Sequence, residues 1–94
     1  MTPERSRVAL VTGAGSGIGR AIAEKLAKNG EQVAVNDLKG EAADEVVARI
    51  KGSGGEAAAA PGDVSDPEAV EQIMATVRDA YGSPEILVNN AGFL

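Results

Sequence analysis

The sequence has no cysteine, no histidine and no tryptophan, and only one tyrosine and one phenylalanine among its 94 residues. The lack of cysteine excludes a disulfide framework, a thiolate metal site and a cysteine nucleophile. The lack of histidine excludes zinc sites of the usual kind and acid–base catalysis by an imidazole. We therefore predict no metal site in this chain.

Positive charge is also scarce, because nine Lys and Arg residues face fourteen Asp and Glu residues, for a formal net charge of −5. Nucleic-acid phosphates are bound by clusters of Lys and Arg, so nucleic acid is not an expected partner. The polar segment 2–7 lacks the apolar run of a secretory signal, and no apolar run is long enough for a membrane span. We expect a cytoplasmic protein that binds no membrane.

The apolar residues that are present make up 44% of the chain and are mainly Ala, Val, Ile and Leu. Such small residues suit helices that pack closely on a parallel sheet. Short apolar runs predict strands at 8–11, 33–35, 56–60 and 86–88. Helical periodicity predicts helices at 18–29, 41–53 and about 65–81, and the length permits one small domain over 1–94.

The apolar positions of each helix recur at helical spacing and predict its buried face. These positions are Ile18, Ile22 and Leu26 in the first helix, Ala43, Val46, Val47 and Ile50 in the second, and Val70, Ile73, Met74 and Val77 in the third. Ser65 and Glu68 have the spacing of a capping box at the start of the third helix. The order β-α-β-α-β-α-β requires right-handed crossovers, which predicts an α/β fold: half of a doubly wound parallel sheet, truncated after the fourth strand.

A glycine-rich turn, Thr12-Gly13-Ala14-Gly15-Ser16-Gly17-Ile18-Gly19, joins the first strand to the first helix. Gly13 permits a tight reversal, while Gly17 and Gly19 permit close approach to a ligand and to the sheet. The helix start offers unpaired N–H groups to a pyrophosphate, and Ser16 adds a hydroxyl. The spacing G-x-x-x-G-x-G differs from both G-x-G-x-x-G and the P-loop. The alternative is that these glycines serve only the turn.

An acidic residue, Asp37, follows the second strand, where a carboxylate accepts hydrogen bonds from the ribose hydroxyls of an adenosine. A carboxylate there repels a 2′-phosphate, so NAD is expected in preference to NADP. Lys39 is a nearby cation that softens this repulsion. The alternative is a solvated aspartate that caps the turn 37–40.

Three motifs together resemble those of the short-chain dehydrogenase/reductases. The glycine turn matches T-G-x-x-x-G-[IL]-G, Asp63-Val64 follows the third strand, and Asn89-Asn90-Ala91-Gly92 matches N-N-A-G after the fourth strand. The resemblance spans essentially all 94 residues. It implies a Rossmann fold and an NAD(P)-dependent oxidoreductase acting on an alcohol or ketone, with a homo-oligomeric parent.

The resemblance also implies roles for individual residues. The pyrophosphate would be lined by Gly13, Ser16, Gly17, Ile18 and Gly19. Asp37 would hold the adenosine ribose, and adenine would face the Asp63 side chain and the Val64 backbone N–H. The ribose on the nicotinamide side would lie beside Asn90, Ala91 and Gly92. Asn89 is expected to tie neighbouring strands.

The family's catalytic residues are a serine and a Tyr-x-x-x-Lys motif in a later part of the fold. Here Tyr81 is followed four positions later by Glu85, so we expect Tyr81 to pack rather than to react. No catalytic residue is expected in this chain. We predict that it is marginally stable and inactive alone, as the cofactor-binding front part of an oxidoreductase. The alternative is a free-standing, non-catalytic nucleotide-binding module.

Overall fold

The computed structural model describes residues 6–91 of the chain. Seven elements alternate along it: β1 (Val8–Val11), α1 (Gly17–Lys28), β2 (Gln32–Val35), α2 (Gly40–Gly52), β3 (Glu56–Ala59), α3 (Pro67–Ala80) and β4 (Ile86–Val88). Each predicted strand and helix is present, and its ends differ by no more than two residues from those expected.

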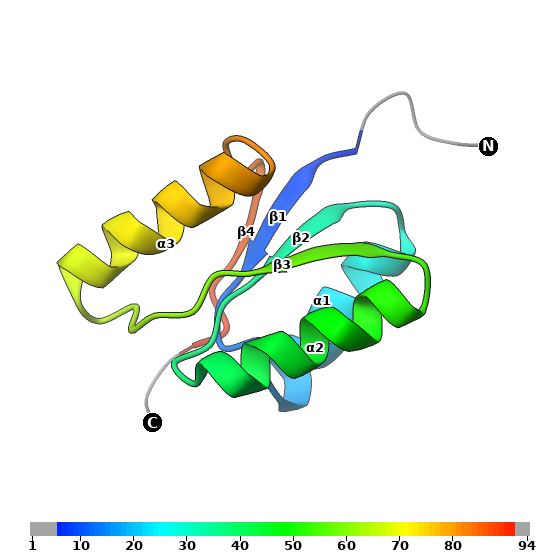
Figure 1. Cartoon of the computed structure of the whole chain (residues 1–94), viewed down its shortest axis with the longest axis horizontal. Coiled ribbons are helices and arrows are strands. Elements are labelled where there is room, and N and C mark those ends of the chain that lie inside the picture. The colour runs from blue at the N-terminus through cyan, green and yellow to red at the C-terminus, as the bar shows by residue number, and fades with distance from the viewer. Residues whose placement is uncertain (1–5, 92–94) are drawn as a thin grey trace.

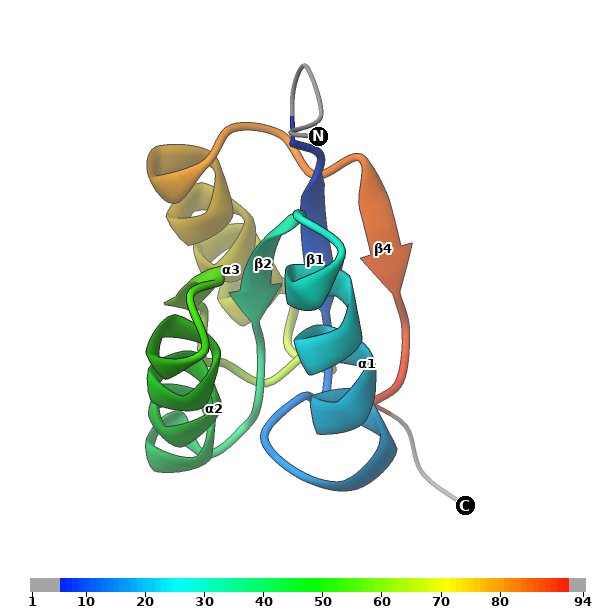
Figure 2. The same ribbon diagram turned by 90° about the vertical axis from the view of Figure 1, so that its right-hand side faces the viewer.

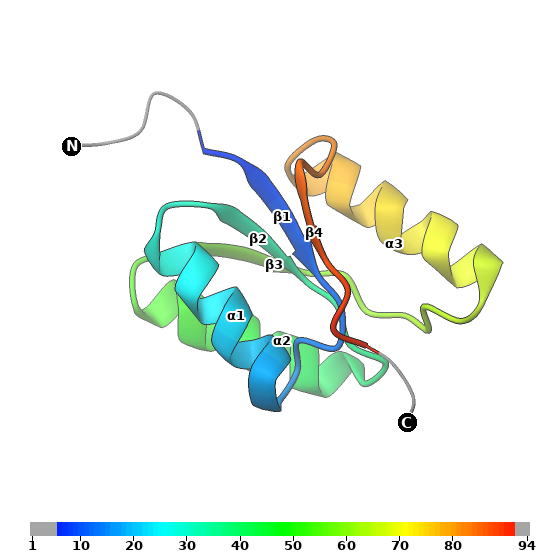
Figure 3. The same ribbon diagram turned by 180° about the vertical axis from the view of Figure 1, so that it is seen from behind.

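The four strands form one parallel sheet in the order β3-β2-β1-β4. Helices α1 and α2 cover one face and α3 covers the other (Figures 1 and 3). Figure 2 shows α1 in front of the central strand β1, with β2 and β4 on either side of that strand. The α/β prediction of a half of a doubly wound sheet is confirmed, and the carboxyl ends of all strands meet at one edge.

The buried side chains form two clusters, one on each face of the sheet, because successive strand residues point to opposite faces. The cluster under α1 and α2 contains Val11, Ala14, Ala23, Ala27, Val33, Val35, Ala43, Val46, Ile50 and Ala57. The cluster under α3 contains Val8, Leu10, Ala34, Ala60, Ile73 and Val77. The predicted buried face of α2 is confirmed, with Val47 only partly buried.

The buried face of α1 differs from the prediction. Gly19, Ala23 and Ala27 are buried against the sheet, whereas Ile18 is 74% exposed. Ile22 and Leu26 are partly buried and pack at the margin of the cluster. The smallest side chains face the sheet because they let the helix backbone approach it closely, and the larger ones flank that contact.

The start of α3 also differs from the prediction. Ser65 does not cap the helix, because its N–H and its hydroxyl both donate to Asp63 Oδ1, at 2.9 and 2.7 Å. The N-cap is Asp66, which accepts from the Glu68 N–H at 3.1 Å, and Pro67 begins the helix. On the helix itself, Ile73 and Val77 are buried as expected, but Val70 is exposed.

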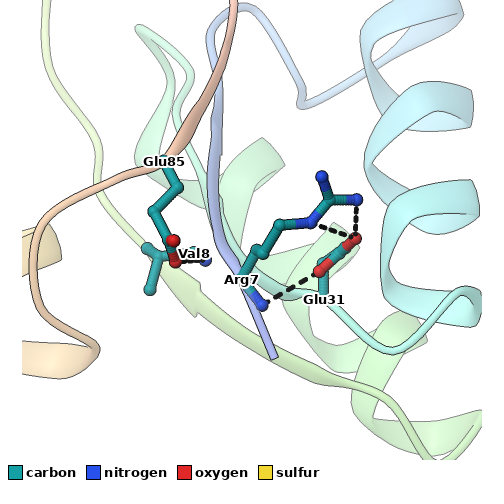
Figure 4. A network of polar contacts seen from close by, with 4 residues as sticks. All are labelled: Arg7, Val8, Glu31 and Glu85. Carbon is teal, nitrogen blue, oxygen red and sulfur yellow. Dashed lines mark hydrogen bonds and ion pairs between the residues drawn. The ribbon is translucent and has the colours of Figure 1, made fainter. Parts of the chain in front are cut away.

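Arg7 and Glu31 lie directly before β1 and β2, at the end of the sheet where the strands begin. They form an ion pair that joins the starts of these two strands (Figure 4). The Glu31 carboxylate accepts from the Arg7 backbone N–H at 3.0 Å, from Nε at 3.1 Å and from Nη2 at 2.6 Å. These bonds hold the pKa of Glu31 below its ordinary value, although burial raises it. Glu85, before β4, accepts from the Val8 N–H at 3.4 Å. We call these contacts the start-edge clamp.

Within residues 6–91, no helix combines the length and the apolar character needed to cross a bilayer.

Candidate functional site

The candidate site lies at the carboxyl edge of the sheet, beside the ends of β1, β2 and β4. A pocket of about 370 Å³ opens there, lined by Gly13, Asn36, Asp37, Leu38, Gly62, Asp63, Val64, Ser65 and Ala91. The structure therefore brings together residues from all three motifs, which are far apart in the sequence. Gly92, also predicted for this site, lies outside the described residues.

The glycine-rich turn uses its glycines for conformation and for close contact. Gly13 and Gly17 have φ values of +62° and +59°, in the left-handed region that favours glycine. Gly19 faces the turn so closely that an added Cβ would overlap the Gly13 carbonyl oxygen and lie 2.6 Å from Asn90 Nδ2. Helix α1 therefore starts in direct contact with the backbone of the turn.

The amino end of α1 is open. Its N-cap, Ser16, makes no side-chain capping bond, and the first intrahelical bond runs from the Arg20 N–H to the Ser16 carbonyl oxygen at 3.3 Å. The N–H groups of residues 17–19 therefore have no intrahelical acceptor. A Cβ added at Gly17 would meet nothing within 4 Å, so the chain leaves open space beside the first residue of the helix. Chemically, this end suits an anion.

The turn is tied to the end of β4 by Thr12, a residue to which the sequence reasoning gave no role. Thr12 Oγ1 accepts from the N–H groups of Asn90 and Ala91, both at 3.0 Å. Asn90 Nδ2 donates to the Gly13 carbonyl oxygen at 3.1 Å. Asn90 thus ties the end of β4 to the glycine-rich turn, while the tie between strands expected of Asn89 stays a prediction.

Asp37 borders the pocket with both carboxylate oxygens engaged. Oδ1 accepts from the Lys39 N–H at 3.0 Å, which is the turn-capping bond of the alternative interpretation. Oδ2 accepts from the Gly15 N–H at 2.9 Å, within the glycine-rich turn. The aspartate therefore caps its own turn and still presents its carboxylate to the pocket.

Asn36 is a second residue that the sequence reasoning missed. It is almost fully buried, and its Nδ2 donates to the carbonyl oxygens of Ala60 and Gly62, at 2.9 and 3.2 Å. These bonds fix the segment after β3 that leads to Asp63. The only signal in the sequence is a polar residue directly after the apolar run 33–35.

Asp63 is exposed at the rim of the pocket, next to Val64. The Ser65 hydroxyl and N–H both donate to its carboxylate, and these bonds hold its pKa below the ordinary value. The carboxylate is therefore ionised near neutral pH and available as an acceptor.

Two other features lie away from this site. Tyr81 packs against the cluster under α3 and its hydroxyl donates to Glu56 at 3.1 Å, while burial raises its pKa, so the predicted packing role is confirmed. A larger hollow of about 600 Å³ lies at the carboxyl ends of α1 and α2. It contains the Glu24–Arg49 ion pair and none of the predicted site residues, so it is not the candidate site.

Known proteins resemble the chain over nearly its whole length. A 3-oxoacyl-[acyl-carrier-protein] reductase of Synechocystis is 46% identical over 98% of the chain. A hydroxysteroid dehydrogenase of Escherichia coli and an L-sorbose reductase of Gluconobacter frateurii, the latter complexed with NADPH and L-sorbose, are 38% and 37% identical. They superpose with a TM-score of 0.89 over 93% and 94% of the chain.

The chain spans only 34–38% of the length of these three proteins. The family model described as short chain dehydrogenase matches residues 7–94, which include every motif on which the resemblance rests. The resemblance stated from the sequence is confirmed. The chain belongs to the short-chain dehydrogenase family of oxidoreductases.

Proposed function

We propose that this chain binds NAD and is the cofactor-binding part of an oxidoreductase that acts on an alcohol or a ketone. The observation that carries the proposal is that the open amino end of α1 and the Asp37 carboxylate meet at one edge of the sheet. That pairing provides donors for a pyrophosphate and an acceptor for a ribose, at the position where doubly wound sheets bind nucleotides.

The pyrophosphate subsite is assigned to the turn and the first residues of α1. The N–H groups of residues 17–19 supply donors and the positive end of the helix, and the Ser16 hydroxyl adds another donor. Gly13 and Gly19 contribute by leaving room, because a side chain at either position would fill the space that the turn needs. Ile18 is exposed beside this end and offers an apolar surface.

The adenosine subsite is assigned to the 370 Å³ pocket. Leu38 and Val64 are both exposed apolar residues in its lining, and they suit the faces of an adenine ring. Asp63 and the Val64 backbone would meet the polar edge of that ring. Each oxygen of the Asp37 carboxylate has two lone pairs, so one acceptor position on each remains for a ribose hydroxyl.

The nicotinamide side is assigned to Asn90, Ala91 and Gly92. The cofactor, when bound, supplies the hydride chemistry, and this chain's residues bind and orient it. We propose no acid–base residue within the chain, since Tyr81 is held by Glu56 beside the start of β3. We further propose a homo-oligomeric enzyme acting in the cytoplasm, with neither nucleic acid nor a membrane as partner.

The preference for NAD over NADP rests on Asp37 alone. A carboxylate at the ribose accepts hydrogen bonds from its hydroxyls and repels a 2′-phosphate. The Lys39 backbone N–H donates to the same carboxylate, but its side chain is the neighbouring cation that would soften the repulsion. Because the sorbose reductase is a complex with NADPH, the relatives do not support this preference.

The test is Asp37→Ser in the ¹⁵N-labelled chain, titrated with NAD and with NADP by NMR, which detects weak binding. We expect the ratio of the NADP to the NAD dissociation constant to fall by about tenfold or more. The reason is that NAD loses one charge-assisted hydrogen bond from its ribose, and a bond of that kind contributes about this factor. Asp44→Ser, which removes an exposed carboxylate from α2, is the matched control. An unchanged ratio would show that Asp37 is only a turn residue. If the unchanged chain binds neither NAD nor NADP, the proposed function is refuted.

A further inference from the structure

Two consecutive N–H groups anchor the glycine-rich turn to the end of β2. The Ala14 N–H donates to the Asn36 carbonyl oxygen at 2.7 Å, and the Gly15 N–H donates to Asp37 Oδ2 at 2.9 Å. The first bond joins backbone to backbone, so it survives a change of side chain. The second depends on a single side chain, and it is therefore the anchor that a substitution removes.

We propose that Asp37 is a positioning residue for the glycine-rich turn, and that it acts on the pyrophosphate subsite through the Gly15 N–H. This role is additional to accepting ribose hydroxyls. The inference rests on the proposed function for the identity of the ligand, whereas the Asp37–Gly15 bond is a property of the protein alone.

Packing supports this role. A Cβ added at Gly15 would lie 2.7 Å from both Cγ and Oδ2 of Asp37, and 2.6 Å from the Cβ of Ala42 in the first turn of α2. These distances are too short for any side chain, so the turn, the end of β2 and the start of α2 touch at this glycine. The Lys39 N–H fixes the other carboxylate oxygen at 3.0 Å. The carboxylate is thus held in one orientation by contacts on both sides.

The positioning role has a consequence that a purely electrostatic role does not have. If Asp37 acted only through its charge, its removal would strengthen the binding of any anion at the turn, because a repulsion would be lost. If Asp37 positions the turn, loss of its acceptor oxygens weakens that binding, because the donors of residues 17–19 are no longer held in place. Inorganic pyrophosphate separates the two cases, since it has no ribose.

The experiment compares Asp37→Ala with Asp37→Asn in the ¹⁵N-labelled chain. Both variants remove the same charge, but only asparagine keeps an acceptor oxygen for the Gly15 N–H. We expect amide hydrogen exchange at Gly15 to be about tenfold faster in Asp37→Ala than in Asp37→Asn, as for the loss of one hydrogen bond. We also expect pyrophosphate to bind more weakly to Asp37→Ala than to Asp37→Asn and the unchanged chain.

The control is Asp44→Ala, which removes a carboxylate from an exposed position on α2 and should leave Gly15 exchange unchanged. If Asp37→Ala unfolds the chain, Gly15 exchange in Asp37→Asn is compared with that in the unchanged chain. Faster exchange in Asp37→Asn supports the proposal, because a neutral amide oxygen is a weaker acceptor than a carboxylate, and unaltered exchange overturns it. Equal exchange in the two variants, or tighter pyrophosphate binding in both, also overturns it. If Gly15 responds as expected but the unchanged chain binds neither pyrophosphate nor NAD, the positioning is supported and the proposed function is refuted.

Discussion

Single residues decide how closely the parts of this site approach one another. Gly19 is the sharpest case, because its Cα faces the Gly13 carbonyl oxygen and the Asn90 amide with no room for a methyl group. Gly52, at the end of α2, is the opposite case, since an added Cβ there would meet nothing within 4 Å. The two glycines therefore form a matched pair for substitution.

We predict that Gly19→Ala destabilises the chain by about 1–3 kcal/mol, as expected for an inserted methyl group in a filled space. It should also abolish detectable NAD binding, because α1 has to move away from the turn that it helps to form. Urea denaturation and an NMR titration with NAD measure the two effects. Gly52→Ala should change neither, and an equal loss in both variants would contradict the explanation.

Residues with distant partners were the ones that the sequence did not reveal. Glycine spacing and the acid after the second strand locate the turn and Asp37, because their chemistry is local. The roles of Thr12 and Asn36 depend on carbonyl and N–H groups 24 to 79 residues away. Nothing in the neighbourhood of a threonine or an asparagine indicates such a partner, so these two positioning roles require the fold.

At the scale of elements, periodicity predicted the strands and helices correctly but misplaced one helix face. The large apolar residues of α1 are Ile18, Ile22 and Leu26, and their helical spacing selects them for burial. The helix instead turns Gly19, Ala23 and Ala27 to the sheet, because contact distance rather than apolar area decides this packing. Ile18 is left at the open end of the helix.

The start-edge clamp gives the β1–β2 pair a dependence on pH. Because the pKa of Glu31 is lower in the folded than in the unfolded chain, its contribution to stability is present above the ordinary value of 4.5 and lost as the pH falls through the folded value. We predict that the free energy of unfolding falls more steeply below about pH 4.5 in the unchanged chain than in Glu31→Gln.

Urea denaturation at a series of pH values measures this difference. The matched control is Glu71→Gln, which alters an exposed carboxylate on α3. That variant should keep the steep fall, because it leaves the bonds between Arg7 and Glu31 intact. A Glu31→Gln profile that runs parallel to the unchanged chain would show that the clamp does not couple stability to protonation.

At the scale of the whole molecule, the described part of the sheet has two unpaired edge strands and one large apolar side chain that is left exposed. Among residues 6–91, β3 and β4 each pair with a strand on one side only. Leu87 of β4 is 58% exposed, and it pairs in register with Leu10 on the face that α3 covers. The unpaired edges and this exposed leucine both reduce the apolar area that the 94 residues bury.

We predict that the 94-residue chain unfolds below about 45 °C, the lower end of the range for small mesophilic domains. With NAD and simple secondary alcohols it should show no turnover, because we assign it no acid–base residue. Calorimetry and the absorbance of NADH measure the two. Cooperative unfolding well above that temperature together with micromolar NAD affinity would favour the free-standing binding module instead.

The bonds from Asn90 and Ala91 to Thr12 also set the time at which the turn is completed during synthesis. They join residues 78 and 79 positions apart, while a ribosome adds roughly 5–20 residues per second. The first strand, the first helix and the second strand emerge from the ribosome long before these partners do. For several seconds, a nascent chain therefore exposes a turn that is anchored to β2 but not yet to β4. The turn therefore gains its contacts through Thr12 only after Asn90 and Ala91 have been added to the growing chain.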